Sequence, residues 1–183
     1  INPDATITLT SGAATTAQEL CKNTALTDVT YTIAGGATGV TGTGFPTGVA
    51  YSLTGGVVTI GGIPTVAGTF NYTITTTGTC VQTQATGTII VNELPTANFT
   101  VVAPNCENKP IIFNDASVPN SGNLNGWNWN FGDATTGTGI TTTHTYAVAG
   151  TYTATLSVTT DKGCVSPILA SQPVNVTVNP KAG

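Results

Sequence analysis

Charged residues are scarce in this chain: Lys and Arg together number 4 and Asp and Glu number 8, among 183 residues. The net charge of −4 leaves no basic surface that could neutralise the phosphates of a nucleic acid, which excludes nucleic acids as partners. No apolar run approaches the roughly 18 residues that a membrane helix needs. We therefore expect no membrane insertion in this segment.

Groups suited to catalysis are also few. His144 is the single histidine, so any Ser-His-Asp or Cys-His device would have to use it. The eight carboxylates are scattered, and no two stand close enough in sequence to mark an acid/base pair. The glycine pairs Gly35-Gly36 and Gly55-Gly56 are not followed by a lysine, so they do not read as phosphate loops. We expect a protein that is not an enzyme and that holds no cofactor.

Threonine and glycine dominate what is present. The chain has 40 Thr and 22 Gly, no Met, and few of the residues that favour helices. Thr suits a pleated, half-buried surface and Gly suits turns, so the composition predicts an all-β fold. Alternating polar and apolar residues predict strands at 6–10, 29–33, 49–53, 57–60, 70–75 and 82–92 in the first half, and at 97–102, 111–113, 127–131, 140–146, 151–160 and 174–178 in the second.

Two stretches do not follow this alternation. Residues 13–20 are rich in Ala and are read either as a short helical turn or as an irregular edge. The stretch around Gly39, Gly42 and Gly44 predicts a glycine-rich loop.

The most informative stretch is Gly126-Trp-Asn-Trp-Asn-Phe-Gly-Asp133. Trp127, Trp129 and Phe131 share a parity, so on a strand their rings face one way while Asn128 and Asn130 face the other. Large aromatic residues at alternate positions, ended by a Gly-Asp turn, indicate a central core strand of a β-sandwich.

This stretch and the residues after it resemble the PKD domain, an immunoglobulin-like module. Its signature runs W-D-F-G-D-G, then H-x-Y, then G-x-Y-x-V-x-L-x-V. The matching positions in this chain are Trp129, Phe131, Gly132, Asp133, His144, Tyr146, Gly150 and Tyr152. The resemblance implies a structural role for His144 and Tyr146. Asn130 and Ala134 depart from the signature, which has Asp and Gly at these places.

The first half carries a related pattern. The segment Val66-Ala-Gly-Thr-Phe70 matches Val148-Ala-Gly-Thr-Tyr152 in the second half. We therefore expect two Ig-like or PKD-like β-sandwiches in tandem: a PKD-like repeat over 1–92, a linker at 93–96, a PKD domain over 97–178, and a linker to a following domain at 179–183.

The first half also resembles Gly- and Thr-rich repeats of very large surface proteins in the Bacteroidetes phylum. The resemblance rests on residues 48–52, 60–75 and 78–80. This resemblance implies an extracellular location, at the cell surface or secreted, and a spacer role in an adhesin or stalk, including those of gliding-motility or filament type. Its partners would be neighbouring domains of the same chain, with any glycan or protein ligand bound elsewhere. Two alternatives stay open: an accessory binding module of a secreted polysaccharide- or protein-degrading enzyme, and a filament subunit with residues 1–10 as a donor strand.

A recurring junction supports a longer array. Ile1-Asn2-Pro3, Val91-Asn92 and Val178-Asn179-Pro180 each place Asn after a β-branched residue, with Pro nearby. Pro limits rotation and cannot continue a strand ladder, which suits a joint between domains. We expect the chain to be an excerpt from an array of such domains.

The four cysteines are Cys21, Cys80, Cys106 and Cys164. The first two are 59 positions apart and the last two are 58 apart, one pair in each half. These matched spans predict the disulfides Cys21–Cys80 and Cys106–Cys164, which would place the protein in an oxidising compartment. Four buried free thiols are the alternative.

Calcium is the one metal that the sequence suggests. Asp115 and Asp133, with the amides and carbonyls of Asn-rich loops, could offer hard oxygen ligands. The competing interpretation is that Asp133 accepts hydrogen bonds from turn amides.

Overall fold

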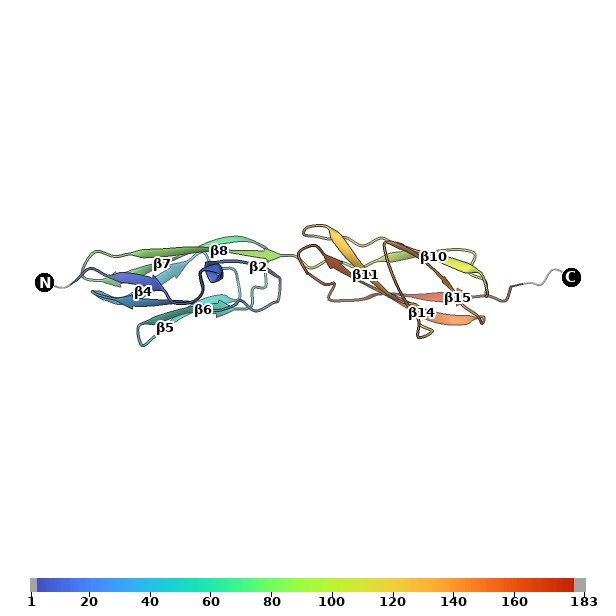
Figure 1. The fold of residues 1–183 in the computed structure, drawn as a ribbon, viewed down its shortest axis with the longest axis horizontal. Coiled ribbons are helices and arrows are strands. Elements are labelled where there is room, and N and C mark those ends of the chain that lie inside the picture. Colours follow the sequence, from blue (N-terminus) through green and yellow to red (C-terminus); the bar gives the residue numbers. More distant parts are fainter. Residues whose placement is uncertain (1–2, 180–183) are drawn as a thin grey trace. The chain divides into compact units, whose positions relative to one another are not determined.

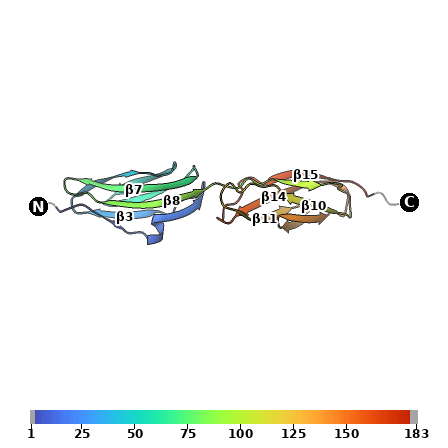
Figure 2. The ribbon, with the colours of Figure 1, turned by 90° about the horizontal axis from the view of Figure 1, so that it is seen from above.

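The computed structural model describes residues 3–179, which form two compact units (Figures 1 and 2). Unit 1 is Ile1–Glu93 and unit 2 is Leu94–Gly183, so the division falls inside the expected linker 93–96. Apart from one short 3-10 helix, η1 (Ala13–Thr16), every element is a strand, and the all-β fold class is confirmed. The expected joint at Ile1-Asn2 and most of the expected linker 179–183 lie outside the described residues.

Unit 1 is a sandwich of two four-stranded sheets. The first has the order β1-β3-β6-β5 and consists of β1 (Thr6–Leu9), β3 (Val29–Ala34), β6 (Val57–Gly62) and β5 (Val49–Thr54). The second has the order β2-β8-β7-β4 and consists of β2 (Ala17–Cys21), β8 (Gln84–Asn92), β7 (Gly68–Gly78) and β4 (Ala37–Thr43). The pairing of β2 with β8 is parallel, and the other pairings in these two sheets are antiparallel.

The long strand β7 shows how the alternation builds the core of unit 1. Its inward residues Tyr72, Ile74 and Thr76 are almost fully buried, while the threonines between them face outward. The buried hydroxyl of Thr76 donates to the carbonyl oxygen of Thr83 at 3.2 Å. The inward apolar residues of both sheets form one cluster, whose best-buried members are Val29, Val58, Ile60, Tyr72, Ile74 and Ile89.

Two sequence interpretations in unit 1 need correction. The expected glycine-rich loop is strand β4, paired with β7. A Cβ at Gly42 would lie 2.7 Å from the ring of Tyr51, so glycine lets the strand pass over this ring. The second is the alternative that residues 1–10 form a free donor strand, which is wrong because Thr6–Leu9 already pair with β3. The ambiguous stretch 13–20 contains η1 followed by β2.

Unit 2 is a sandwich of a three-stranded and a four-stranded sheet. The first has the order β13-β10-β9 and consists of β13 (Thr141–Thr145), β10 (Pro110–Asp115) and β9 (Phe99–Val102). The second has the order β12-β11-β14-β15 and consists of β12 (Thr136–Thr138), β11 (Leu124–Asn130), β14 (Gly150–Thr160) and β15 (Ala170–Val176). The sequence interpretation missed β12, which is only three residues long.

The aromatic strand β11 supplies the centre of this core. Trp129 is 1% exposed and Asn128 is exposed, which confirms the predicted register. Trp129 packs edge-on against Phe99, with ring centroids 5.2 Å apart. Its indole nitrogen donates to the carbonyl oxygen of Gly139 at 2.9 Å, so the buried polar atom is satisfied.

In each unit the chain begins at one pole and leaves at the other. In unit 1 the backbone nitrogen of Ala5 donates to Val81, just before β8, and β8 then runs to Asn92 at the exit. In unit 2 Thr96 pairs with Val118 at one end, and Thr177 pairs with Cys106 at the other. The ends of each sandwich are therefore separated by about the length of its strands.

This geometry overturns both predicted disulfides. Cys21 lies opposite Asn92 at the exit of unit 1, whereas Cys80 precedes the other end of β8. Eight residue steps along a strand span roughly 26 Å, whereas bonded cysteines have Cα atoms within about 7 Å. The matched sequence spans between the cysteines were misleading, because residues at such a separation can lie at opposite ends of the sandwich as well as side by side.

The two cysteines of unit 2 are separated in the same way. Cys106 lies beside Thr177, and the carbonyl of Cys164 accepts from Thr160 at the far end of β14. The bonds Cys21–Cys80 and Cys106–Cys164 are thus wrong. Cys106 is a free thiol, whereas Cys21 and Cys164 are each disulfide-bonded.

Candidate functional site

The turn that follows β11 carries most of the signature residues. Gly132 has φ +85°, and a Cβ there would meet the carbonyl oxygen of Thr153 at 2.5 Å, so this position requires glycine. Its backbone nitrogen donates to Asn130 Oδ1 at 2.9 Å. Ala134 also has a left-handed φ, of 70°, which is costly for a residue with a Cβ. The turn is therefore held in a conformation that needs support from its side chains.

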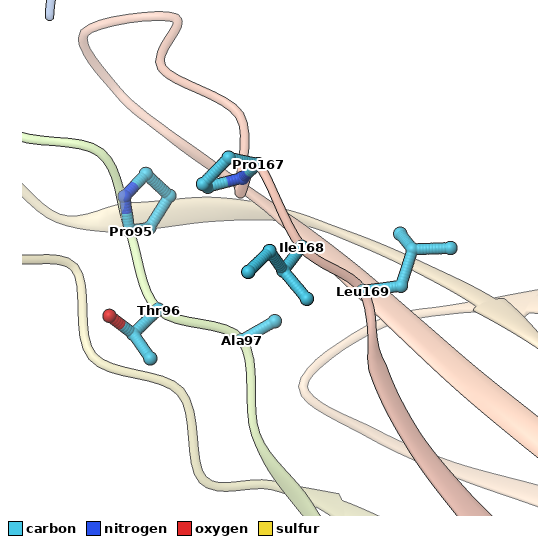
Figure 3. Close-up of a pocket in the computed structure, with 6 residues that line it drawn as sticks. All are labelled: Pro95, Thr96, Ala97, Pro167, Ile168 and Leu169. Atoms are coloured by element: carbon cyan, nitrogen blue, oxygen red, sulfur yellow. The ribbon is translucent and has the colours of Figure 1, made fainter.

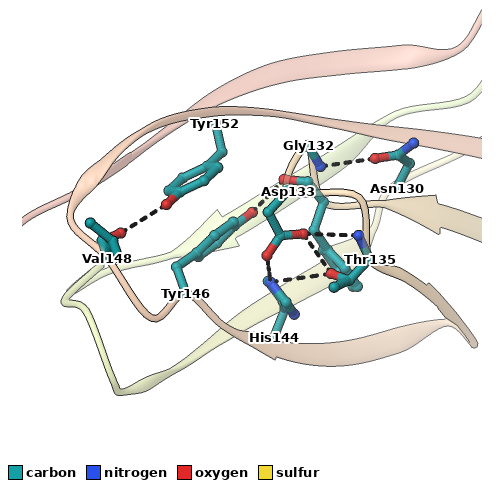
Figure 4. A network of polar contacts seen from close by, with 9 residues as sticks. Asn130, Gly132, Asp133, Thr135, His144, Tyr146, Val148 and Tyr152 are labelled. Atoms are coloured by element: carbon teal, nitrogen blue, oxygen red, sulfur yellow. Dashed lines mark hydrogen bonds and ion pairs between the residues drawn. The ribbon is translucent and has the colours of Figure 1, made fainter.

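Asp133 gives that support (Figure 4). Its Oδ1 accepts from the backbone nitrogen of Thr135 at 3.1 Å and from the Thr135 hydroxyl at 2.6 Å. Its Oδ2 lies 2.7 Å from His144 Nε2. Burial alone would raise the pKa of the Asp133 carboxyl, but the hydrogen bonds from Thr135 and His144 outweigh burial and hold the pKa below its ordinary value.

His144 is clamped between rings. It stacks on Phe131 with a centroid distance of 4.2 Å and an angle of 5°, and it meets Tyr146 edge-on at 4.4 Å. The Thr135 hydroxyl is 3.5 Å from the same Nε2 atom that faces Asp133. A Ser-His-Asp relay needs the hydroxyl and the carboxylate on different ring nitrogens. The arrangement therefore joins β13 to the turn and is unsuited to activating the hydroxyl.

The two signature tyrosines extend this cluster. The hydroxyl of Tyr146 donates to the carbonyl oxygen of Phe131 at 2.8 Å, and its ring stacks on Tyr152 at 4.2 Å. Tyr152 in turn donates to the carbonyl oxygen of Val148 at 2.9 Å. Burial, with smaller contributions from the charges of Asp133 and Tyr152, raises the pKa of Tyr146 to about 12. Both tyrosines therefore fix backbone segments at one pole of unit 2.

The calcium candidates do not come together. His144, beside Asp133, lies opposite Ile111 on β10, whereas Asp115 is four residues further along the same strand. This separation is about 13 Å. Asp115 Oδ1 instead accepts from the backbone nitrogen of Ser117 at 3.0 Å. Within residues 3–179 no three His, Cys, Asp or Glu side chains cluster as metal ligands would.

Sequence reasoning missed an apolar groove in unit 2 (Figure 3). It encloses about 220 Å³ and is lined by Pro95, Thr96, Ala97, Pro167, Ile168 and Leu169. Ile168 is 79% exposed. The apolar run 167–169, in the connection between β14 and β15, was the signal that could have indicated it. No helix in the described part of the chain is long and apolar enough to cross a bilayer.

Comparison with protein families matches residues 92–178 to the PKD domain. Among curated proteins none matches this chain. Three solved structures show the range of similarity.

The PKD1 domain of Vibrio anguillarum Epp is 27% identical, with 48% of this chain and 99% of that chain covered and a TM-score of 0.43. A structure of carbohydrate-binding modules from the β-sandwich superfamily is 31% identical over 48% of this chain and 36% of that one, with a TM-score of 0.45. The chain thus spans about a third of that protein's length.

A three-domain Ig fragment of titin is similar over both units. It is 12% identical, covers 97% of this chain and 67% of its own, and has a TM-score of 0.56. At this identity the likeness concerns the fold alone, and it agrees with two Ig-like sandwiches in series. Residues 92–178 match the family model of the PKD domain, and they fall in the second of two tandem Ig-like β-sandwich units in this chain.

Proposed function

We propose that this chain is a structural spacer segment of a longer extracellular protein, an adhesin or stalk of the kind that Bacteroidetes surface repeats form. The role is mechanical support and distance, without catalysis or a bound cofactor. The observation that carries the proposal is the placement of the two ends of each unit at opposite poles. A unit of this form adds about the length of its longest strands, roughly 35 Å, to the reach of the chain.

Two further observations support this function. Cys21 and Cys164 are disulfide-bonded, which suits an oxidising environment outside the cytoplasm. The single histidine is committed to the Asp133 clamp, where it stabilises the turn of the PKD domain. The most distinctive polar cluster of unit 2 therefore has a structural use.

The test is replacement within the parent protein. Residues 3–179 would be exchanged for two unrelated Ig-like sandwiches of similar length, and in a second variant they would be deleted. A spacer predicts that the exchange preserves adhesion and the height of the tip above the cell in electron micrographs, while the deletion shortens it. Equal loss of adhesion in both variants, with the height retained in the exchange, would show that the segment itself binds.

That outcome would favour a second candidate, an accessory binding module of a secreted enzyme. The groove lined by Pro95 and Ile168 is the observation in its favour. The large hydrophobic side chains exposed within residues 3–179 are all aliphatic, whereas a polysaccharide platform of stacked rings would expose aromatic ones. The spacer is therefore the preferred proposal.

A further inference from the structure

A hollow of about 320 Å³ lies on the outer face of β5 and β6 in unit 1 (both labelled in Figure 1). Val58 and Ile60 of β6 point into the core, so Thr59 and Gly61 face outward. Across the pairing, Ser52 lies opposite Thr59, and Ala50 lies opposite Gly61. The hollow exists because small residues take the places where the neighbouring outward positions carry larger side chains.

Asp28 forms one wall of this hollow. A Cβ at Gly61 would lie 2.3 Å from Asp28 Oδ1, so the carboxylate rests directly over the bare glycine. Asp28 is the only charged residue of the lining. Within residues 3–179 its carboxylate and the hydroxyls of Ser52 and Thr59 make no hydrogen bond to other protein groups. The site therefore presents one acceptor group and two hydroxyls that both donate and accept.

We propose that this hollow binds one pyranose unit of a neutral polysaccharide. A carboxylate can accept hydrogen bonds from two adjacent sugar hydroxyls, and such charge-assisted bonds are stronger than neutral ones. The hydroxyls of Ser52 and Thr59, which line the same hollow, suit the remaining hydroxyls of the same ring. Ala50, exposed beside Gly61 on the neighbouring strand, gives a small apolar surface that the carbon-bonded hydrogens of the ring can approach.

The size and shape agree with this ligand class. Pockets for small ligands enclose about 300–1,000 Å³, and 320 Å³ is at the lower end, which suits one sugar unit. The hollow is open at the sheet surface, so a sugar unit within a polysaccharide can reach it. A shallow site with few polar contacts predicts weak binding, with a dissociation constant of about 1 mM. This inference goes beyond the spacer function, which holds whether or not unit 1 contacts a glycan.

The experiment is an NMR titration of the isotope-labelled 183-residue chain. The probes are cellotetraose, xylotetraose, mannotetraose and chitotetraose, each added to several millimolar. We expect at least one of them to shift the backbone amides of Asp28, Ser52, Thr59 and Gly61 in a saturable way, and to do so equally in EDTA. The inference is overturned if none of the four shifts these amides, or if only calcium chloride or free lysine does, which would make Asp28 a cation site.

Matched variants locate the binding. Asp28→Asn and Ser52→Ala, both at exposed positions, should each weaken binding by about fivefold or more through loss of a hydrogen bond. Gly61→Ala should abolish binding because its methyl group displaces the Asp28 carboxylate. Gly12→Ala is its control, since nothing lies within 4 Å of a Cβ there. Should Gly61→Ala fail to fold, Asp28→Asn decides: unchanged affinity in that variant refutes the site.

Discussion

The hydroxyl groups of Tyr31 and Tyr72 meet at 3.2 Å inside unit 1 and connect its two sheets, one from β3 and the other from β7. Burial, together with this hydrogen bond, raises the pKa of Tyr72. Tyr72 is 1% exposed and Tyr31 is 3% exposed. Each hydroxyl therefore depends on the other, because no water can replace a lost partner at this depth.

The two tyrosines should be energetically coupled, so that the costs in unfolding free energy of the two single replacements do not add. Tyr72→Phe leaves the Tyr31 hydroxyl buried and unpaired, which should destabilise unit 1 by about 1–3 kcal/mol. The double variant Tyr31→Phe/Tyr72→Phe should cost clearly less than the two single variants added together. Circular dichroism in urea measures this. Both tryptophans lie in unit 2, so an unchanged tryptophan fluorescence transition is the internal control, and strict additivity would contradict the coupling.

Truncation of the central aromatic residue should unfold unit 2 alone. Trp129→Ala removes a fully buried ring and its bond to Gly139, at a cost of about 3–5 kcal/mol. The fluorescence of the remaining Trp127 should then report a transition at much lower urea. The exposed neighbour gives the control, since Asn128→Ala should leave the midpoint almost unchanged. A Trp129→Ala midpoint equal to that of the unaltered protein would refute the packing described for β11.

Acid should weaken unit 2 through Asp133. Its folded pKa lies below its unfolded value, so its contribution to stability is present above the ordinary aspartate pKa of about 3.9 and is lost as the pH falls through the folded pKa. Asp133→Asn should lower the melting temperature of unit 2 at pH 7, and it should make the loss between about pH 5 and pH 2 shallower. Melting curves followed by tryptophan fluorescence across this range test it. If the melting temperatures of the two proteins fall in parallel as the pH is lowered, the contacts of Asp133 are not the source of the acid sensitivity.

Asp161 is a second acid-sensitive group in unit 2. Hydrogen bonds from the backbone and the side chain of Asn123 lower its pKa. The pKa shift has the same direction as that of Asp133, so Asp161 also loses its contribution to stability in acid. Some acid sensitivity should therefore survive in Asp133→Asn and decline further in the double variant with Asp161→Asn. A single variant that already removes all pH dependence would show that Asp161 contributes nothing.

Cysteine chemistry tests the corrected pairing. We expect a maleimide reagent to label Cys106 in the folded chain without reductant, because its thiol is free. Cys21 and Cys164 should become reactive only after reduction, since both are disulfide-bonded. Mass spectrometry of tryptic and chymotryptic peptides identifies the labelled positions. A Cys106–Cys164 peptide in the unreduced digest would restore the original prediction and refute the described topology.

The strands were predictable where inner and outer positions alternate cleanly. Trp129 and Asn128 illustrate this, because a large ring and a small amide at adjacent positions leave one register possible. Strand β4 was missed because Gly42 has no side chain to show the alternation. Glycine is needed there because the ring of Tyr51, on another strand, occupies the space of a side chain. The disulfides failed for a similar cause, since sequence distance does not tell which pole of a sandwich a residue occupies.

The candidate site was partly visible in advance. Asp133 and His144 were identified from the signature, and the competing interpretation of Asp133 as an acceptor for the turn amides agrees with its bond to Thr135. The contact between Asp133 and His144 could not be read from spacing, because it depends on how the turn after β11 meets β13, which belongs to the other sheet. The hollow at Asp28 could not be predicted at all, since it arises from Gly61 and Ala50 meeting across two strands.

The alternation along β7 also bears on how a sandwich of this kind can diverge in sequence. Tyr72, Ile74 and Thr76 are each fixed by packing against both sheets or by a buried hydrogen bond, whereas Thr73 and Thr75 between them meet solvent. Tolerance to substitution should therefore rise and fall every second residue along this strand. Related sandwiches can therefore differ at most of their outward residues, keep the same interior, and present different surfaces from one scaffold.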